Sequence, residues 1–398
     1  MSNEKLGQLS RIVIKGYKSI KDCDDLELGN LNVLIGANGA GKSNFMSVFE
    51  ILQSVLSRAL THYAGKKGTE TLFYNGKEAT DSIITEFYFG EDLYSFEVEW
   101  TENNSLIFRS ESLIFDGKEL LGEGGHNESA VLNTLRRLSY DKDIEISKTM
   151  LNPGWIVYRF QNTTSSSQKK SEHDLSNDVA LMAEGQNLAA FLYRIKKNFP
   201  KSYADILYAI QLVAPYFNDF VLEPKELNEE QIVLRWQEKN CNDVFNASQF
   251  SDGTLRFICL ATLLLQPSEL QMSTIIIDEP ELGLHPYAVT VFAELVKKVS
   301  ISKQIILSTQ SVELLNHFEA DDVVVVDKNE NGSEFKRLNS AKLAEWLEDD
   351  YTLGELWSKN IFGGKSYAGF YFVAGVCGGV QFTAENKRIF IVAFAYRK

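Results

Sequence analysis

The sequence contains few cysteines and histidines, and neither type is spaced as a metal site or a disulfide framework requires. Its 398 residues include four widely separated cysteines and five histidines, without any Cys-x-x-Cys pair. We therefore expect neither a zinc site nor a set of disulfides, and a reducing compartment such as the cytoplasm fits this cysteine usage.

Long apolar runs are also absent. No stretch approaches the roughly 18 clean apolar residues that a membrane helix needs. The nearest, 367–382, is short and rich in glycine, so it is interpreted as a strand. The N-terminus, MSNEKLGQLS, lacks the charged-then-apolar pattern of a secretion signal. We expect a soluble, cytoplasmic protein.

An excess of positive charge is the third absence. The formal net charge is −14, whereas proteins that hold DNA along a track usually carry a basic excess, because much of their affinity comes from neutralising phosphates. Direct nucleic-acid binding would need a local basic patch. The most basic stretch, 193–201, is better interpreted as the solvated face of a helix.

One segment that is present predicts a nucleotide site. Residues 36–43, GANGAGKS, match the phosphate-binding pattern G-x-x-x-x-G-K-[ST] and lie between an expected buried strand, 31–35, and an amphipathic helix over about 43–60. Glycines let backbone N–H groups surround phosphate oxygens, and the helix adds the positive end of its dipole. Lys42 is predicted to reach the β- and γ-phosphates, and Ser43 to ligate Mg²⁺.

A second block of motifs follows more than 200 residues later. TIIIDEP, 274–280, is an apolar strand that ends in two carboxylates. Asp278 is predicted to hold Mg²⁺ or its water, and Glu279 to act as the general base toward the attacking water. Gln310, in the STQS turn after the strand QIIL, is either a ligand of the γ-phosphate or water, or an ordinary polar turn residue.

A Ser-Asp-Gly sequence opens an apolar helix at 251–253. The simple interpretation is a helix cap, with Ser251 or Asp252 accepting from free N–H groups. The alternative keeps this geometry but directs the helix N-terminus, which attracts anions, at the γ-phosphate held by another subunit. Residue chemistry alone leaves the two open.

The order of these elements predicts an α/β protein: a P-loop ATPase head with a mixed sheet flanked by helices. Antiparallel strands are expected from about 70 to 160, an exposed loop at 161–174, and helix at 181–213. The chain is divided into an N-terminal part of the ATPase domain (1–65), an inserted β-rich and helical region (66–244), a C-terminal part of the ATPase domain (245–365), and a tail without assigned origin (366–398).

The motif order resembles that of the ABC-type ATPase superfamily, and within it the RecF/SMC-like, overcoming-lysogeny-defect-like (AAA-type) group. The opening IVIKGYKSIKD…LNVLIGANGAGKSN carries this resemblance, which spans residues 9–365. It implies a Walker B role for Asp278, catalytic roles for Glu279 and Gln310, and a nucleotide-binding set of Lys18, Gly36, Asn38, Gly39, Ala40, Gly41, Lys42, Ser43, Asn44, Ser251, Asp252 and Gly253. Residues 281–285 match the D-loop.

Three departures from the family pattern stand out. Gln310 occupies a position where many relatives have histidine, the signature is SDGT rather than SGGQ, and no Q-loop glutamine can be assigned. Some relatives carry a TOPRIM nuclease domain after the ATPase, and no acidic cluster suited to two metals follows Asp327. A nuclease is therefore expected on a separate polypeptide.

The resemblance implies a slow ATPase that uses ATP and Mg²⁺ as a molecular switch. Two copies, or a higher oligomer, would close around ATP, with Ser251 and Gly253 of one copy facing Lys42 of the other. The expected setting is bacterial anti-phage defence with a TOPRIM- or HNH-type effector. The alternatives are a RecF-like repair ATPase that binds DNA itself and, less in keeping with the β-rich insert, a transporter ATPase subunit.

Overall fold

The computed structural model describes a single unit within residues 1–366. The described residues are 8–102, 105–131, 133–134, 154–161, 173–174, 178–225, 228–348 and 351–364. The strand predicted at 367–382 and most of the loop predicted at 161–174 lie outside them.

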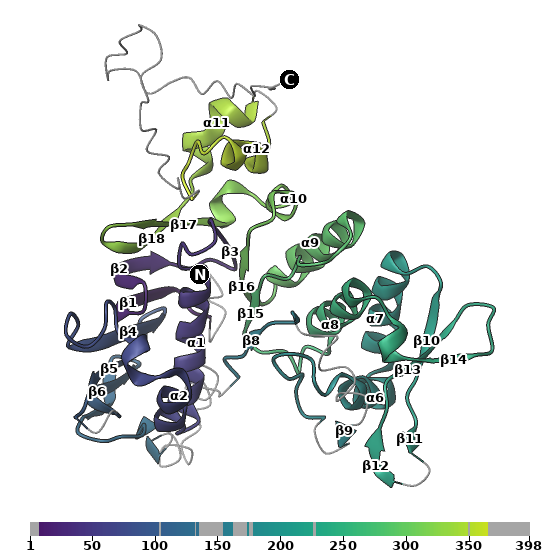
Figure 1. The fold of residues 1–398 in the computed structure, drawn as a ribbon, viewed down its shortest axis with the longest axis horizontal. Coiled ribbons are helices and arrows are strands. Elements are labelled where there is room, and N and C mark those ends of the chain that lie inside the picture. The colour runs from purple at the N-terminus through teal and green to yellow at the C-terminus, as the bar shows by residue number, and fades with distance from the viewer. Residues whose placement is uncertain are drawn as a thin grey trace, which may run out of the picture. The chain divides into compact units, whose positions relative to one another are not determined.

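A six-stranded, mainly parallel sheet lies at the centre of the unit, in the order β18-β17-β3-β16-β15-β8 (Figure 1). Its strands are β3 (Leu31–Ile35), β8 (Val157–Tyr158), β15 (Thr274–Asp278), β16 (Gln304–Thr309), β17 (Val323–Asn329) and β18 (Gly332–Arg337). Strands β3, β15 and β16 are buried along their whole length. This burial on both faces explains their apolar, β-branched sequences and confirms the strands predicted at these positions.

The register of this sheet places its motifs at one edge. Thr309 pairs with Ile35, and Asp278 pairs with Ser308, in parallel ladders. The carboxyl ends of β3, β15 and β16 therefore coincide, and the loops that follow them meet. This is the edge of an open α/β sheet at which ligands bind.

A second, antiparallel sheet has the order β2-β1-β4-β5-β6-β7. Its strands are β1 (Arg11–Tyr17), β2 (Ile20–Glu27), β4 (Ser82–Phe89), β5 (Asp92–Trp100), β6 (Leu106–Phe115) and β7 (Lys118–Glu123). Strand β4 alternates between buried and half-buried positions, as expected when one face covers a core. The helix α1 (Lys42–Leu56) shares a core with apolar residues from both sheets, including Ile14, Phe87 and Ile276.

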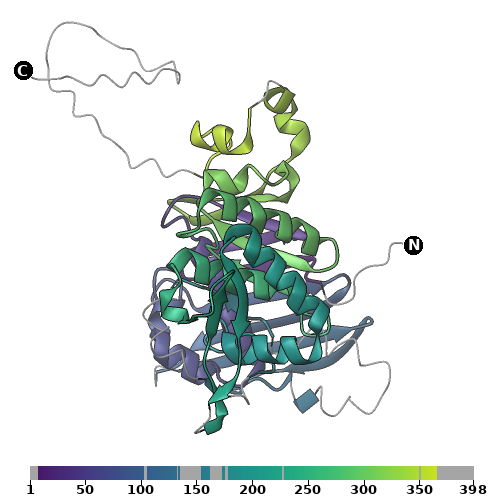
Figure 2. The same cartoon turned by 90° about the vertical axis from the view of Figure 1, so that its right-hand side faces the viewer.

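Helices cover the other face of the parallel sheet, and Figure 2 looks onto them. Alternate residues of its strands, such as Val33, Ile275 and Leu307, point into this second core. The helices that share it are α6 (Leu188–Asn198), α7 (Pro200–Val213), α8 (Asp252–Leu265) and α9 (Pro286–Ser300). Of the helix predicted over 181–213, residues 181–187 are not helical, and the rest forms two helices that are separated just before Pro200, which cannot donate a backbone hydrogen bond.

Short elements complete the unit. Two three-stranded sheets are formed by β10 (Phe217–Val221), β13 (Arg235–Glu238) and β14 (Val244–Asn246), and by β11 (Pro224–Lys225), β12 (Asn228–Ile232) and β9 (His173–Asp174). The remaining helices are α2 (Leu60–Lys67), α10 (Val312–Leu315), α11 (Ser340–Glu348) and α12 (Leu353–Ser358), with 3-10 turns η1 (Thr69–Leu72), η3 (Ala247–Gln249) and η4 (Ala320–Asp322).

The region predicted as an insert, 66–244, contributes to both large sheets. Strands β4 to β7 continue the sheet begun by β1 and β2, and β8 extends the parallel sheet beside β15. Within the described part of the chain, no helix is long and apolar enough to cross a membrane.

Candidate nucleotide site

The glycine-rich loop leaves β3 and enters α1 under tight steric limits. A Cβ on Gly36 would lie 2.3 Å from the carbonyl oxygen of Val326, and one on Gly41 would lie 2.1 Å from Ser333 Oγ. Gly41 also has a φ of 118°, which side-chain-bearing residues rarely adopt. Two of the predicted glycines are therefore required by packing, and the loop conformation leaves the N-terminus of α1 free for an anion.

Lys42 points back over this loop. Its side chain is 4% exposed, and Nζ donates to the carbonyl oxygens of Gly36, at 2.5 Å, and Ala37, at 3.1 Å. Burial lowers the pKa of Lys42, against the opposing field of Glu279 and Asp278. A buried ammonium whose contacts are neutral carbonyls fits a phosphate chain, which would supply the missing negative charge. Ser43 is exposed beside it, as a ligand of an incoming ion would be.

Asp278 is the most buried carboxylate of the site, with 4% of its side chain exposed. Ser308 Oγ donates to Oδ1, and Arg159 Nε donates to Oδ2 at 2.7 Å. Arg159 also pairs with Glu50 of α1, which Lys67 approaches at 3.3 Å. Burial alone would raise the pKa of Glu50, but the two cations outweigh it and hold that pKa below its ordinary value. The Arg159 ion pairs thus join β8, α1 and β15 beneath the predicted metal ligand.

Glu279 follows Asp278 with a φ of 51°, a strained conformation for a residue with a side chain. Its backbone N–H donates to the Ser308 carbonyl at 3.1 Å. Two amides hold its carboxylate: Gln310 Nε2 donates to Oε1, and Gln161 Nε2 donates to Oε2 at 3.0 Å. The structure therefore brings together Glu279 and Gln310, the two residues predicted as catalytic. It also places the amide of Gln161 against the same carboxylate.

Gln161 was missed at the sequence level. It follows β8, which has only two residues and pairs in parallel with the strand of Asp278. The polar run that begins at Gln161 predicts a loop, and no local pattern indicates that this loop starts next to Glu279. The only local indication of this strand is the short apolar run at 156–158 before Gln161. Such a pattern is too common in sequences to identify a site.

Glu281 holds the STQS turn that carries Gln310 by hydrogen bonds. Its Oε1 accepts from Thr309 Oγ1 at 2.7 Å and from the Gln310 backbone N–H at 3.0 Å. Burial raises the pKa of this carboxyl, and its Oε2 is buried without a hydrogen-bond partner in the described part of the chain. Glu281, predicted within the D-loop, thus orients the backbone on which the Gln310 amide depends.

The Ser-Asp-Gly segment caps α8, as the simpler interpretation predicts. Ser251 Oγ accepts from the Thr254 N–H at 3.1 Å, and both Ser251 and Asp252 are exposed. Gly253 packs against the D-loop, where an added Cβ would lie 2.4 Å from the Gly283 carbonyl oxygen. The cap geometry and its exposure leave this helix end accessible to a second molecule.

Arg256, one turn further along α8, connects this helix to the segment after β15 and to Gln161 of its own chain. Its guanidinium donates to the carbonyl oxygen of Leu282 and, at 2.7 Å, to that of Gln161. His285 caps α9 by accepting from the Tyr287 N–H at 3.3 Å.

Lys18 and Ser19 lie beside the first turns of α1. Lys18 has a φ of 49° and donates from Nζ to Ser47 Oγ at 2.8 Å, while burial lowers its pKa to about 8. Ser19 Oγ accepts from Asn44 Nδ2 at 2.7 Å. The two residues are therefore close to the phosphate loop, although nothing in this arrangement tests a contact with nucleotide.

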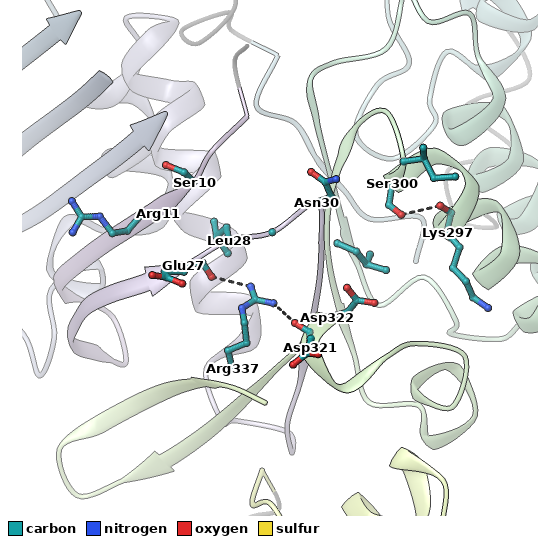
Figure 3. Close-up of a pocket in the computed structure, with 13 residues that line it drawn as sticks. Ser10, Arg11, Glu27, Leu28, Asn30, Lys297, Ser300, Asp321, Asp322 and Arg337 are labelled. Carbon is teal, nitrogen blue, oxygen red and sulfur yellow. Dashed lines mark hydrogen bonds between the residues drawn. The ribbon is translucent and has the colours of Figure 1, made fainter. Parts of the chain in front are cut away.

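A separate cavity of about 780 Å³ lies where β3 begins, lined by Asn30 and Leu31 among others. Arg337 crosses it and donates to the carbonyl oxygens of Glu27, at 2.8 Å, and Asp321, at 2.9 Å (Figure 3). This is the opposite end of β3 from the glycine loop, and none of the predicted site residues lines the cavity. It is therefore separate from the candidate nucleotide site.

Comparison with known proteins agrees with this geometry. The chain is similar to the Old nuclease of Escherichia phage P2, with 24% identity in an alignment of 376 residues that covers 85% of this chain and 62% of that protein. It is similar to the chromosome segregation protein sudA of Emericella nidulans, with 29% identity over 176 residues, 43% of this chain and 13% of that protein. The chain thus spans less than two thirds of either relative.

Solved structures share the fold. The Smc head bound to the C-winged helix domain of ScpA superposes with a TM-score of 0.60 at 16% identity, covering 85% of this chain and 99% of that chain. An Smc head domain with an extended coiled coil, bound to the C-terminal domain of ScpA from Pyrococcus furiosus, gives 0.53 at 14% identity, covering 86% and 99%.

A family profile described as "AAA domain, putative AbiEii toxin, Type IV TA system" matches residues 31–316, which is more than half of the chain. This match begins at β3 and ends after α10, so it contains the glycine loop, the capped α8 and the carboxylates that follow β15. The chain shares the fold of the Smc head domains and is similar in sequence to the Old nuclease, and it belongs to this AAA-domain family.

Proposed function

We propose that this chain is an ATP-driven switch that dimerises around ATP and regulates a separate effector in bacterial anti-phage defence. The observation that carries the proposal is the convergence of Lys42, Asp278 and Glu279 at one edge of the sheet, with two side-chain amides on the Glu279 carboxylate. This is the arrangement that positioning a water against a phosphoryl group requires.

Each group has a distinct task in hydrolysis. The N–H groups of residues 39–43 and the Lys42 ammonium bind the phosphates, and Glu279 accepts a proton from the attacking water. Gln310 and Gln161 hold that carboxylate in place and orient the water by their amides. Mg²⁺, held by Ser43 and Asp278, would neutralise charge on the β- and γ-phosphates.

The second half of the site comes from another copy of the chain. The exposed Ser251 cap presents the N-terminus of α8, which favours an anion. Asp252 beside it carries a negative charge, so the attraction comes from the backbone N–H groups and the Ser251 hydroxyl. A γ-phosphate between Lys42 of one copy and this cap of the other would hold the dimer closed, and hydrolysis would release it.

The defence setting rests on the relatives. The chain is similar to a phage-encoded nuclease over 85% of its own length, yet it covers only 62% of that protein. Slow turnover would keep the closed, ATP-bound state long-lived, as regulation of an effector requires. The effector is a nuclease or toxin supplied by a separate polypeptide.

Two variants test the ATPase assignment. Lys42→Ala removes the ammonium that faces the phosphates and should abolish binding of ATP in calorimetry. Glu279→Gln keeps the size of the side chain but removes its basicity, so it should bind ATP, lose at least about 100-fold in hydrolysis rate and accumulate as a dimer in sedimentation velocity with ATP. Glu294→Gln, on the exposed side of α9, is the matched control.

The outcomes separate the parts of the proposal. Unchanged ATP affinity of Lys42→Ala would overturn the assignment of the phosphate loop, and near-normal hydrolysis by Glu279→Gln would remove Glu279 from catalysis. If Glu279→Gln binds ATP and remains monomeric across the concentration range, the composite dimer site is wrong.

A further inference from the structure

A second concave site lies next to the phosphate loop and is built from segments far apart in the sequence. It is a cavity of about 420 Å³ between the β1–β2 turn, the first turn of α1, the segment after η1, and the β17–β18 turn. The residues that line it include Lys18, Asn44, Tyr74, Lys328 and Glu330. The motifs of the sequence identify no residue that recognises the nucleotide base, and this cavity supplies candidates.

Hydrogen bonds attach the walls of this cavity directly to the glycine loop. Ser333 Oγ, at the start of β18, donates to the carbonyl oxygen of Ala40 at 2.6 Å and lies within hydrogen-bond distance, 2.7 Å, of Ser19 Oγ. Ser19 Oγ also accepts from Asn44 Nδ2, and the Ser333 N–H donates to the Ser19 carbonyl at 2.7 Å. A ligand bound by the loop would therefore meet these walls without any rearrangement of the strands.

The strand order determines which end of a bound nucleotide would enter. The loop follows β3, which lies between β16 and β17. The groups that act on the γ-phosphate, Asp278 and Glu279, lie on the β16 and β15 side, whereas the cavity lies on the β17 and β18 side. A triphosphate across the loop with its γ-end at Glu279 therefore directs its α-phosphate toward Asn44 and the cavity.

Tyr74 provides a flat surface in this cavity. Its backbone N–H donates to the Gly16 carbonyl at 2.9 Å, and its backbone carbonyl accepts from Thr80 Oγ1 at 2.6 Å. These two hydrogen bonds fix the position of the Tyr74 backbone. Gly332, with a φ of 107°, leaves room for the ring, because a Cβ there would lie 3.0 Å from Tyr74 Cε2. An aromatic side chain that lines a polar cavity offers a platform on which a base can stack.

We propose that this cavity, the nucleoside pocket, takes the ribose and base of the nucleotide, with the Tyr74 ring as the stacking platform and the β17–β18 turn as the outer wall. The Glu330 carboxylate is the acceptor offered to the ribose hydroxyls, a role that acidic residues perform in other nucleotide sites. Lys18 lies on the inner side, nearest the phosphates. The inference rests on the proposed nucleotide site and adds the residues that distinguish a nucleotide from a bare polyphosphate.

The test compares two ligands that differ only in the nucleoside. Binding of ATP and of inorganic tripolyphosphate, each with Mg²⁺, is measured by calorimetry for the full chain and its variants. Tyr74→Ala should weaken ATP about 5- to 100-fold, the range expected for loss of one stacked base, and leave tripolyphosphate within about twofold. Tyr74→Phe should restore ATP binding, and Tyr208→Ala, an exposed tyrosine on α7, is the matched control.

The possible results are distinguishable. Wild-type ATP affinity in Tyr74→Ala, or an equal loss for both ligands, would overturn the nucleoside pocket. Failure of the wild-type chain to bind either ligand would instead overturn the proposed nucleotide site. As a measurement that needs no variant, photolysis of bound 8-azido-ATP should label a peptide containing residues 71–75 or 328–332, and labelling confined to other peptides contradicts the inference.

Discussion

Replacing Arg159 with methionine tests the charged cluster beneath the site. The change keeps a long apolar stem but removes the cation that contacts both Asp278 and Glu50. Asp278, 4% exposed, would keep only Ser308 as a partner, whereas Glu50 is 18% exposed and retains Lys67 at 3.3 Å. The variant would therefore leave the negative charge of Asp278, more than that of Glu50, buried without a counter-ion.

The expected cost follows from that difference. Loss of one partner of a buried pair typically costs about 3 to 5 kcal/mol. Because Glu50 keeps a cation and Arg159 is 29% exposed, we expect the lower end, about 3 kcal/mol. With a urea dependence of about 3 kcal/mol per M, the unfolding midpoint should fall by about 1 M.

A matched control and a double variant make the result decisive. Arg109→Met breaks an exposed pair with Glu97, in which Arg109 is 60% exposed, and should cost less than about 1 kcal/mol. The double variant Arg159→Met/Asp278→Asn neutralises the unpaired carboxylate. Its loss of unfolding free energy should be smaller, by at least about 1 kcal/mol, than the sum of the losses in the two single variants. A midpoint shift for Arg159→Met no larger than that for Arg109→Met, or full additivity in the double variant, would refute the reasoning.

Three further predictions concern single residues. Burial disfavours the charged amine of Lys18 and lowers its pKa to about 8. At pH 8 the neutral fraction of Lys18 should therefore exceed that of an ordinary lysine by roughly two orders of magnitude. Pulsed acetylation followed by mass spectrometry should label Lys18 first at pH 8, and this preference should be smaller at pH 6.5. Gly36→Ala should lose nucleotide binding and stability because its Cβ would meet Val326, whereas Gly65→Ala, with nothing within 4 Å in α2, should be neutral or slightly stabilising in thermal unfolding. Ser251→Ala should lower the free energy of unfolding by about 1 kcal/mol through loss of the α8 cap, and it should weaken ATP-dependent dimerisation. Ser251→Asp, which can also cap the helix, should restore the stability but not the dimerisation.

Local patterns predicted the core of the site because its chemistry is contiguous. The glycine loop, Lys42 and Ser43 lie within one strand–turn–helix segment, and the Asp278–Glu279 pair ends one apolar strand. The capped α8 was also expected from Ser251. These features need no knowledge of distant contacts, since a phosphate loop works through its own backbone N–H groups.

Other residues could not be predicted because their partners are remote in the chain. Arg159 meets Asp278 across 119 positions, and Gln161 meets Glu279 across 118. Both follow β8, a two-residue strand that becomes recognisable only when it pairs with β15. The two helices within 181–213 were predicted as one because Pro200 fits the first turn of a helix as readily as it breaks one.

The amino-acid sequence by itself determined the class of protein and the phosphate end of its site, because spacing within a short segment sets the loop, the lysine and the carboxylates. The tertiary structure alone decided what surrounds them. The order β18-β17-β3-β16-β15-β8 puts Asp278 and Glu279 on one side of the loop and the β17–β18 turn on the other. Strand order depends on long-range pairing, and no local window of residues encodes it.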